Sequence, residues 1–236
     1  RIDDAIWRDV VNSEHAVTAF SDAAFVDLPE PLKSVKDSQG EVYVQLLTEG
    51  AIEDVIVSRI SRLIQGDTLD IAMFYLSDRD VVESLKLADS NGAKIRVLLD
   101  PNKDAFGRKK DGVPNRQVAD ELLKHTKGNT MIRWCDTHGE QCHSKMLLFK
   151  NASSTTMIAG SANLTRRNIG DFNLESNVLV EGNNVTAIRD AQNFFNETWT
   201  NTNGRVYSTD YEEYKNESLL KTIQYRLMEG LGTSSF

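Results

Sequence analysis

Cysteine, proline and long hydrophobic runs are scarce in this chain of 236 residues, which contains two cysteines and four prolines. No apolar stretch reaches the roughly 18 residues needed for a membrane-spanning helix, so none is predicted. Cys135 and Cys142 alone supply too few ligands for a zinc site, and we expect no metal. The two thiols can form a disulfide across the short segment between them or stay free, and the sequence leaves both open.

Basic residues are outnumbered, with 27 Lys and Arg against 35 Asp and Glu and a formal net charge of −8. An acidic chain is repelled on average by nucleic acid and by anionic lipid, which disfavours a nucleic-acid partner but allows a local basic pocket. Basic side chains gather at residues 107–112 and at Arg166 and Arg167. Each group can attract phosphate; the alternatives are a solvated loop for the first and salt bridges for the two arginines.

Hydrophobic periodicity indicates an α/β domain over residues 41–236, in which a mixed β-sheet is flanked by helices on both faces. Alternating or fully apolar segments predict strands over residues 41–50, 67–76, 93–101, 130–136, 143–150, 155–162 and 172–182. Helical spacing predicts helices over residues 51–66, 78–92, 115–128 and 184–201, and a C-terminal helix over 211–232. Residues 1–40 have a different character, a helical segment followed by a linker with Pro, Ser and Gly.

Five polar residues fall on successive predicted strands or at their ends: His143, Lys145, Ser161, Asn163 and Glu175. Side chains two residues apart on a strand point to the same face, so the first two should project together, as should Ser161 and Asn163. A neutral imidazole can act as a nucleophile or base, and lysine and amide groups can hold phosphate oxygens. A glutamate that accepts from the second ring nitrogen would fix the tautomer. Such a site needs no metal.

Most other polar candidates have structural explanations, and a single histidine at the start of a strand usually has one too. The H-T-K sequence at 125–127 repeats the spacing of His143 and Lys145, but it ends a helix before a glycine, where cations stabilise the helix dipole. We interpret His138 as a loop residue and His15 as a helix-surface residue. Asp100 ends a strand, where it can cap the following loop.

The five residues lie in motifs that resemble those of the phospholipase D superfamily, H-x-K-x-x-x-x-D followed by G-S-x-N and a downstream acidic residue. This chain reads HSK at 143–145, GSAN at 160–163 and NLE at 173–175. The resemblance covers residues 41–200 and looks like the lipid-processing branch. One position departs from the pattern, because Lys150 stands where the family has Asp. We expect this change to be harmless if Lys150 faces solvent at a hairpin tip.

The resemblance implies hydrolysis or transphosphatidylation of a glycerophospholipid through a phosphohistidine, without a cofactor. His143 would be the nucleophile or its acid/base partner, Lys145 and Asn163 would bind phosphate oxygens, Ser161 would assist, and Glu175 would orient a histidine. The alternatives are a metal-independent nuclease of the same superfamily and a catalytically silent phosphate-binding protein.

The resemblance also implies a partner, because the family chemistry uses two histidines and this chain has one H-x-K motif of that kind. We favour the C-terminal half of a two-motif, bacterial-type phospholipase D, with residues 1–40 closing the preceding half. A homodimer is the alternative. We expect a secreted or membrane-peripheral protein that contacts phospholipid. The N-x-S/T sequons support secretion only weakly; they begin at Asn151, Asn163, Asn184, Asn196 and Asn216.

Overall fold

The structure is a computed structural model that describes residue 8 and residues 42–105, 108–109, 111–170, 172–216, 218, 222–223 and 225–227, with only the backbone of 104, 105, 108, 109 and 203. Apart from residue 8, the predicted N-terminal helix and linker therefore lie outside the described residues, as does His15.

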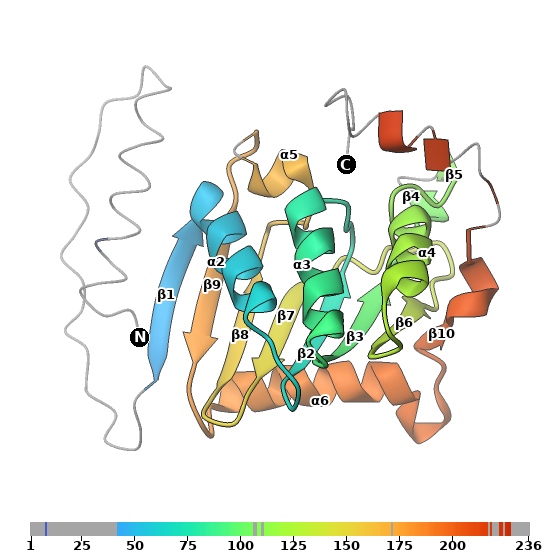
Figure 1. Ribbon diagram of the computed structural model, residues 1–236. Coiled ribbons are helices and arrows are strands. Elements are labelled where there is room, and N and C mark those ends of the chain that lie inside the picture. Colours follow the sequence, from blue (N-terminus) through green and yellow to red (C-terminus); the bar gives the residue numbers. More distant parts are fainter. Residues whose placement is uncertain are drawn as a thin grey trace, which may run out of the picture.

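An eight-stranded sheet forms the centre of the molecule, with strand order β1-β9-β8-β7-β2-β3-β6-β10 (Figure 1). Strands β2, β3 and β6 run parallel to one another, and the other neighbours pair antiparallel. The sheet is therefore mixed, as predicted. The strands are β1 (Tyr43–Thr48), β2 (Thr68–Met73), β3 (Lys94–Leu99), β6 (Thr130–Cys135), β7 (Lys145–Lys150), β8 (Thr155–Gly160), β9 (Ser176–Glu181) and β10 (Ser208–Asp210).

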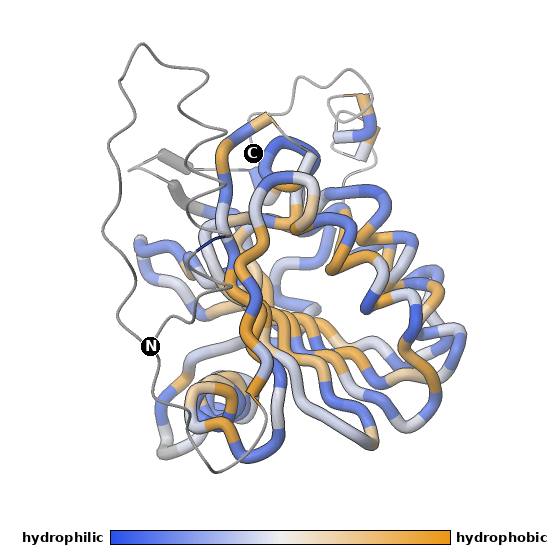
Figure 2. Tube along the Cα trace, turned by 90° about the vertical axis from the view of Figure 1, so that its left-hand side faces the viewer, coloured by the Kyte–Doolittle hydropathy of each residue, from blue (hydrophilic) through white to orange (hydrophobic). Residues whose placement is uncertain are grey.

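Helices cover both faces of the sheet, which confirms the predicted architecture (Figures 1 and 2). Helices α2 (Gly50–Ser61), α3 (Arg79–Ser90) and α4 (Asn115–His125) lie on one face, and α6 (Thr186–Thr200) lies on the other. Alternation along β2 sends Ile71 and Met73 into the larger core under the three helices and Ala72 into the smaller core under α6.

The short elements are where the structure differs from the sequence predictions. The strand predicted over 172–182 begins at Ser176, so residues 172–175 form a loop in which Phe172 and Leu174 are exposed. The predicted C-terminal helix begins instead as a 3-10 turn, η2 (Tyr211–Tyr214), and much of the remainder lies outside the described residues. Unpredicted elements are α5 (Arg166–Ile169), β4 (Asp104–Ala105), β5 (Arg108–Lys109), β10 and the 3-10 turn η1 (Thr202–Gly204).

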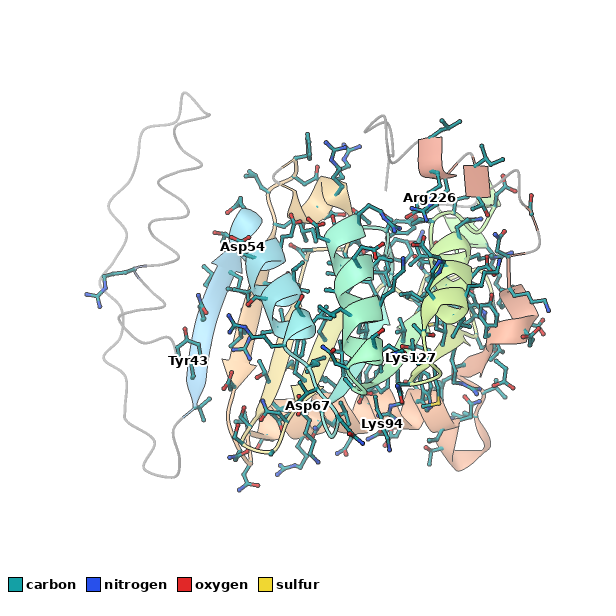
Figure 3. All side chains as sticks on the ribbon, in the orientation of Figure 1. Tyr43, Asp54, Asp67, Lys94, Lys127 and Arg226 are labelled. Atoms are coloured by element: carbon teal, nitrogen blue, oxygen red, sulfur yellow. A yellow bond between two sulfur atoms is a disulfide. The ribbon has the colours of Figure 1, made fainter. Side chains whose placement is uncertain are left out.

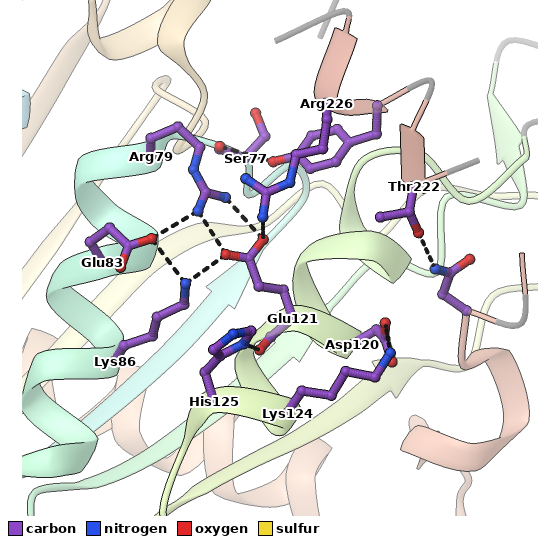
Figure 4. A network of polar contacts seen from close by, with 12 residues as sticks. Ser77, Arg79, Glu83, Lys86, Asp120, Glu121, Lys124, His125, Thr222 and Arg226 are labelled. Carbon is purple, nitrogen blue, oxygen red and sulfur yellow. Dashed lines mark hydrogen bonds and ion pairs between the residues drawn. The ribbon is translucent and has the colours of Figure 1, made fainter. Parts of the chain in front are cut away.

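An ion-pair cluster around Glu121 joins α3, α4 and the C-terminal segment (Figure 4). The Glu121 carboxylate accepts from Arg79 at 2.7 Å, Lys86 at 2.6 Å and Arg226 at 2.7 Å. Burial alone would raise the pKa of Glu121, but hydrogen bonds from Arg79 and Lys86, with the charges of Arg79 and Arg226, lower it to about 2. The cluster thus keeps a nearly buried carboxylate ionised and fixes α3 against α4.

The strand ends form two opposite edges of the sheet, and these edges differ in the residues that they carry. Asp67, Lys94 and Lys127 lie at the edge where β2 and β3 begin, and Arg226 lies at the opposite edge, where the parallel strands end (Figure 3). All five candidate site residues lie at or just beyond the strand ends of this second edge. Among the described helices, none combines the length and the apolar composition needed to cross a bilayer.

Candidate active site

Three neighbouring strands bring the predicted residues to one edge of the sheet. His143 and Lys145 lie at the start of β7, Ser161 and Asn163 follow β8, and Glu175 precedes β9. Because β7, β8 and β9 are adjacent and antiparallel, the start of β7, the end of β8 and the start of β9 meet at the same edge. The sheet topology therefore gathers motifs that lie up to 32 residues apart in the chain.

His143 and Lys145 project together, as the strand spacing predicts. Lys145 Nζ lies 3.2 Å from Nδ1 and 3.3 Å from Nε2 of the His143 ring, and it donates to the His143 backbone oxygen at 3.2 Å. Burial and the charge of Lys145 lower the pKa of His143 below its ordinary value. A lowered pKa leaves the imidazole neutral at neutral pH, which is the form that can attack phosphorus or accept a proton.

Phe74 forms a wall beside this pair. Its ring centroid lies 4.7 Å from that of His143, and Lys145 Nζ lies 5.4 Å from the centroid of Phe74. The Phe74 amide donates to the Ser144 carbonyl at 2.8 Å, which continues the β2–β7 pairing up to the residue after His143. Burial lowers the pKa of Lys145, and the charge of Glu175 opposes this. The site therefore combines an apolar wall with a partly desolvated cation.

An amide–carboxylate network, made of Asp100, Asn102 and Asn115, lies behind Phe74 and is almost fully buried. Asp100 Oδ2 accepts from the amide of Cys142 at 2.7 Å, and Oδ1 accepts from the amide of Asn102 at 2.7 Å. This confirms that Asp100 caps the loop after β3, and it also fixes the residue before His143. Burial raises the pKa of Asp100, and the hydrogen bonds from Cys142 and Asn102 oppose this shift.

Asn115 connects this network to the end of β2. Its Nδ2 donates to the carbonyls of Phe74 at 2.7 Å and Asp100 at 2.8 Å, and its Oδ1 accepts from the amide of Leu76 at 2.9 Å. Backbone groups at the end of a buried strand need such partners because water cannot reach them. One side chain on α4 therefore orders the chain on either side of Tyr75.

A disulfide joins Cys135, at the end of β6, to Cys142, which decides the question that the sequence left open. Cys142 directly precedes His143 and is held from two sides, by the disulfide and by Asp100. The segment that leads into the site is therefore tied to two neighbouring strands of the parallel part of the sheet.

Asn163 lies where the chain crosses from β8 towards the end of β2. Its Oδ1 accepts from the amide of Tyr75 at 3.3 Å, and the amide of Leu164 donates to the Tyr75 carbonyl at 3.0 Å. In the part of the chain that the structure describes, Asn163 Nδ2 donates to no protein group. This orientation presents an amide donor, which is what the predicted phosphate-binding role requires.

Ser161 and Glu175 form a second pair across β8 and β9. Ser161 Oγ donates to Glu175 Oε2 at 2.5 Å and accepts from the amide of Ser176 at 3.0 Å. Asn168 Nδ2 donates to the other carboxylate oxygen. The sequence predicted that Glu175 would accept from a histidine ring, but its hydrogen bonds among the described residues are to Ser161 and Asn168. Its role in orienting a histidine stays a prediction.

Asn168 and Gly160 support this pair, and sequence reasoning did not identify their roles. Thr165 donates to Asn168 Oδ1 at 2.8 Å, which turns the Asn168 amide towards Glu175. A side chain at Gly160 would place its Cβ 2.2 Å from both Asn177 Oδ1 and the Ser176 carbonyl. The glycine of the GSAN motif is thus required by the close approach of β9.

Three further expectations about polar residues are confirmed. Lys150 is exposed at the end of β7, beside the hairpin that leads to β8, so its positive charge meets solvent. His125 ends α4, and its Nδ1 lies 2.8 Å from the Glu121 carbonyl. His138 is exposed in the loop after β6. Of the two H-x-K sequences, only the one at 143–145 reaches the site.

An open cavity of about 690 Å³ lies on the helix side of this edge, and none of the predicted catalytic residues lines it. Its walls include Phe172 and Arg166, with the starts of α2 and α3. Arg79 and Arg226 also line it, but both are engaged by Glu121. No group of three or more His, Cys, Asp or Glu side chains that could hold a metal occurs among the described residues.

Residues 56–199, more than half of the chain, match the protein family described as cardiolipin synthase, PLD-like domain. No curated protein matches the sequence. Three solved structures resemble the fold. Nuc of Salmonella typhimurium, a phospholipase D family member, aligns with TM-score 0.54 and 16% identity over 75% of this chain and 100% of its own. NucT of Helicobacter pylori aligns with TM-score 0.51 and 17% identity, over 68% and 97%.

The third structure is phosphatidylserine synthase of Haemophilus influenzae, with TM-score 0.59 and 12% identity over 96% of this chain. The chain spans 52% of that protein's length. At these identities the likeness shows the fold alone, so the choice between lipid and nucleic-acid substrates depends on the residues of this chain.

Proposed function

The chain belongs to the PLD-like family that its residues 56–199 match, and on that premise we propose that it cleaves phosphodiester bonds of glycerophospholipids through a phosphohistidine. The observation that carries the proposal is the contact between a neutral, partly desolvated His143 and Lys145 at the sheet edge, 3.2–3.3 Å apart. The free amide of Asn163 supports it, because lysine and amide donors together complement the oxygens of a phosphodiester.

In the proposed mechanism, a ring nitrogen of His143 attacks phosphorus as the bond to the leaving alcohol breaks. A second histidine, from another H-x-K motif, gives its proton to that alcohol. Water or an acceptor alcohol then attacks the phosphohistidine, and the second histidine takes up its proton, which restores His143. Lys145 and Asn163 stabilise the charge that develops on the phosphate oxygens. With the two roles exchanged, His143 would act as the acid and base.

The second histidine would come from a second copy of this chain or from a preceding half. In this proposal Glu175, held by Ser161 and Asn168, would orient that incoming ring. Light scattering of the purified protein, combined with mass spectrometry of its components, distinguishes the two sources. A single species of twice the chain mass supports the homodimer, and a second polypeptide with an H-x-K motif supports the two-half arrangement.

A lipid substrate is favoured over a nucleic acid by the net charge of −8 and by exposed Phe172 and Leu174, which lie within three residues of Glu175. The proposal is tested by assaying the purified protein in EDTA against mixed micelles of phosphatidylcholine or phosphatidylglycerol and, in parallel, against single-stranded DNA. Release of the headgroup and shortening of the DNA are the two readouts.

The matched variants are His143→Ala and His125→Ala, since each removes the histidine of an H-x-K sequence but only the first is in the site. We expect lipid turnover to fall by about a thousandfold or more in the first variant and to stay unchanged in the second. Cleavage of DNA without lipid turnover would make the protein a nuclease. Equal behaviour of His143→Ala and the parent on both substrates would leave only a phosphate-binding role.

A further inference from the structure

The segment between Asn163 and Glu175 carries exposed apolar and basic side chains next to the site. Phe172 is 66% exposed and Leu174 is 64% exposed, the two highest values among the large apolar side chains of the described residues. Arg166 and Arg167 begin α5 and are exposed as well. We call residues 166–170 and 172–175 the α5–β9 tip. It projects at the catalytic edge and has a hydrophobic end (Figures 1 and 2).

We propose that the α5–β9 tip docks the protein onto a bilayer that contains anionic lipid. This inference rests on the proposed lipid substrate, and it names the surface by which the enzyme would reach it. Phe172 and Leu174 would enter the boundary between headgroups and acyl chains, as the apolar residues of interfacial segments do. Single exposed apolar residues are ordinary, but two of them on a projecting tip beside a site for a lipid phosphate are not.

The two arginines supply the charge complementarity. The Arg166 guanidinium lies 5.6 Å from the centroid of the Phe172 ring, and Arg167 Nε donates to Asn173 Oδ1 at 3.3 Å. Within the described ranges neither arginine forms an ion pair with a carboxylate, whereas nearby Arg79 and Arg226 both pair with Glu121. Arg166 and Arg167 therefore keep charge available for lipid phosphates, in a chain whose net charge would otherwise oppose an anionic surface.

The location of the tip gives docking a direct consequence for the reaction. Glu175 follows Leu174 and accepts from Ser161, so the inserted end of the tip is joined by one peptide bond to the predicted site. His143 and Lys145 lie at the same edge of the sheet. A protein docked in this way would place Lys145 at the level of the lipid phosphates, and the phosphodiester would not have to leave the membrane.

The test measures binding without turnover, so that it does not depend on the proposed reaction. The parent protein is His143→Ala, sedimented with vesicles of phosphatidylcholine and phosphatidylglycerol and, separately, with vesicles of phosphatidylcholine alone. Three variants are made in this parent: Phe172→Ser with Leu174→Ser, Arg166→Gln with Arg167→Gln, and a control, Ile64→Ser with Phe194→Ser. The control removes two exposed apolar side chains, of 60% and 49% exposure, outside the tip.

We expect the parent to bind the anionic vesicles more tightly than the neutral ones, and less tightly as salt is raised. The apolar pair of changes should weaken binding by about tenfold or more, and each lost arginine by about fivefold. The control should match the parent. No binding by the parent, or equal binding by all variants, would overturn the proposal. If the apolar changes instead abolish self-association in a sedimentation experiment without lipid, the tip faces a second copy of the chain, and membrane docking is wrong.

Failure of docking and failure of the proposed function give different results. If the protein binds vesicles through the tip but never releases a headgroup from micelles, the proposed reaction is wrong and the proposed docking surface stands. If the protein turns over micellar lipid and its tip variants still bind vesicles normally, the proposed reaction stands and the proposed docking surface is wrong.

Discussion

His143 follows a backbone segment held by side chains that solvent hardly reaches, whereas Glu175 follows a loop whose apolar side chains are largely in solvent. In the amide–carboxylate network, Asp100 is 2% exposed and Asn115 is fully buried, while Phe172 in the α5–β9 tip is 66% exposed. A reacting group must keep its geometry before substrate arrives, which favours a buried and fully hydrogen-bonded support. A docking surface must do the opposite and leave its apolar area uncovered.

The largest effect on stability is expected when Asn115, at the centre of the amide–carboxylate network, is removed. Asn115→Ala deletes three hydrogen bonds and leaves the Leu76 amide and the Phe74 carbonyl without this partner in a region closed to water. We expect the free energy of unfolding to fall by about 3 kcal/mol, since each unsatisfied buried group costs about 1–3 kcal/mol. Urea unfolding measures this.

The matched control is Asn183→Ala, which removes a single exposed hydrogen bond to Ser153 and should change stability by less than about 0.5 kcal/mol. If Asn115→Ala behaved like this control, the network would not be the support that its burial indicates.

A second variant tests whether the covalent tie before His143 adds to the same support. Replacing Cys135 and Cys142 by serine should lower the free energy of unfolding by about 2 kcal/mol, because the disulfide restricts a short loop in the unfolded chain. Thermal unfolding of the variant, compared with the parent with and without a reducing agent, gives the measurement. The reduced parent should resemble the variant, and a variant as stable as the oxidised parent would contradict the prediction.

A third variant concerns the charge beside His143. Burial and the charge of Lys145 both lower the pKa of His143, so Lys145→Gln removes the second cause and should raise that pKa towards its ordinary value. In the parent the ring is neutral at pH 7 and protonates only as the pH falls through the lowered pKa, so the variant should protonate at higher pH. NMR titration of the His143 ring, assigned with His143→Ala, follows this. Lys124→Gln, an exposed change on α4, is the control. If the pKa of His143 did not move in Lys145→Gln, the prediction would be contradicted.

The sequence predicted those residues of the site that belong to short local motifs. His143, Lys145, Ser161, Asn163 and Glu175 stand in short motifs, and strand alternation was sufficient to expect them at neighbouring strand ends. The α/β architecture followed from the same periodicity. The prediction failed where a polar segment is short, as in β10, and at residues 172–175, where alternation alone mimicked a strand.

The support behind the site was not predictable, because it depends on contacts between distant residues. Asn115 reaches Phe74 across 41 positions of the sequence, and Asp100 reaches Cys142 across 42. Nothing near either residue in the sequence marks it as a hydrogen-bond partner of a strand end. Asp100 was recognised only as a cap for its own loop, and the sequence left the disulfide open because it does not show that the segment before β7 returns to the end of β6.

The smallest expected effect is the one that tests the exposed half of the contrast. Phe172→Ser together with Leu174→Ser should change the free energy of unfolding by less than about 0.5 kcal/mol, because both side chains already face solvent in the folded chain. Urea unfolding of this variant and of Asn115→Ala, measured side by side, compares the free-energy change at the exposed tip with that at the buried network. A loss above about 1 kcal/mol would mean that the tip is packed against protein in solution, through a second copy or another segment, and that its apolar area is not available to a membrane.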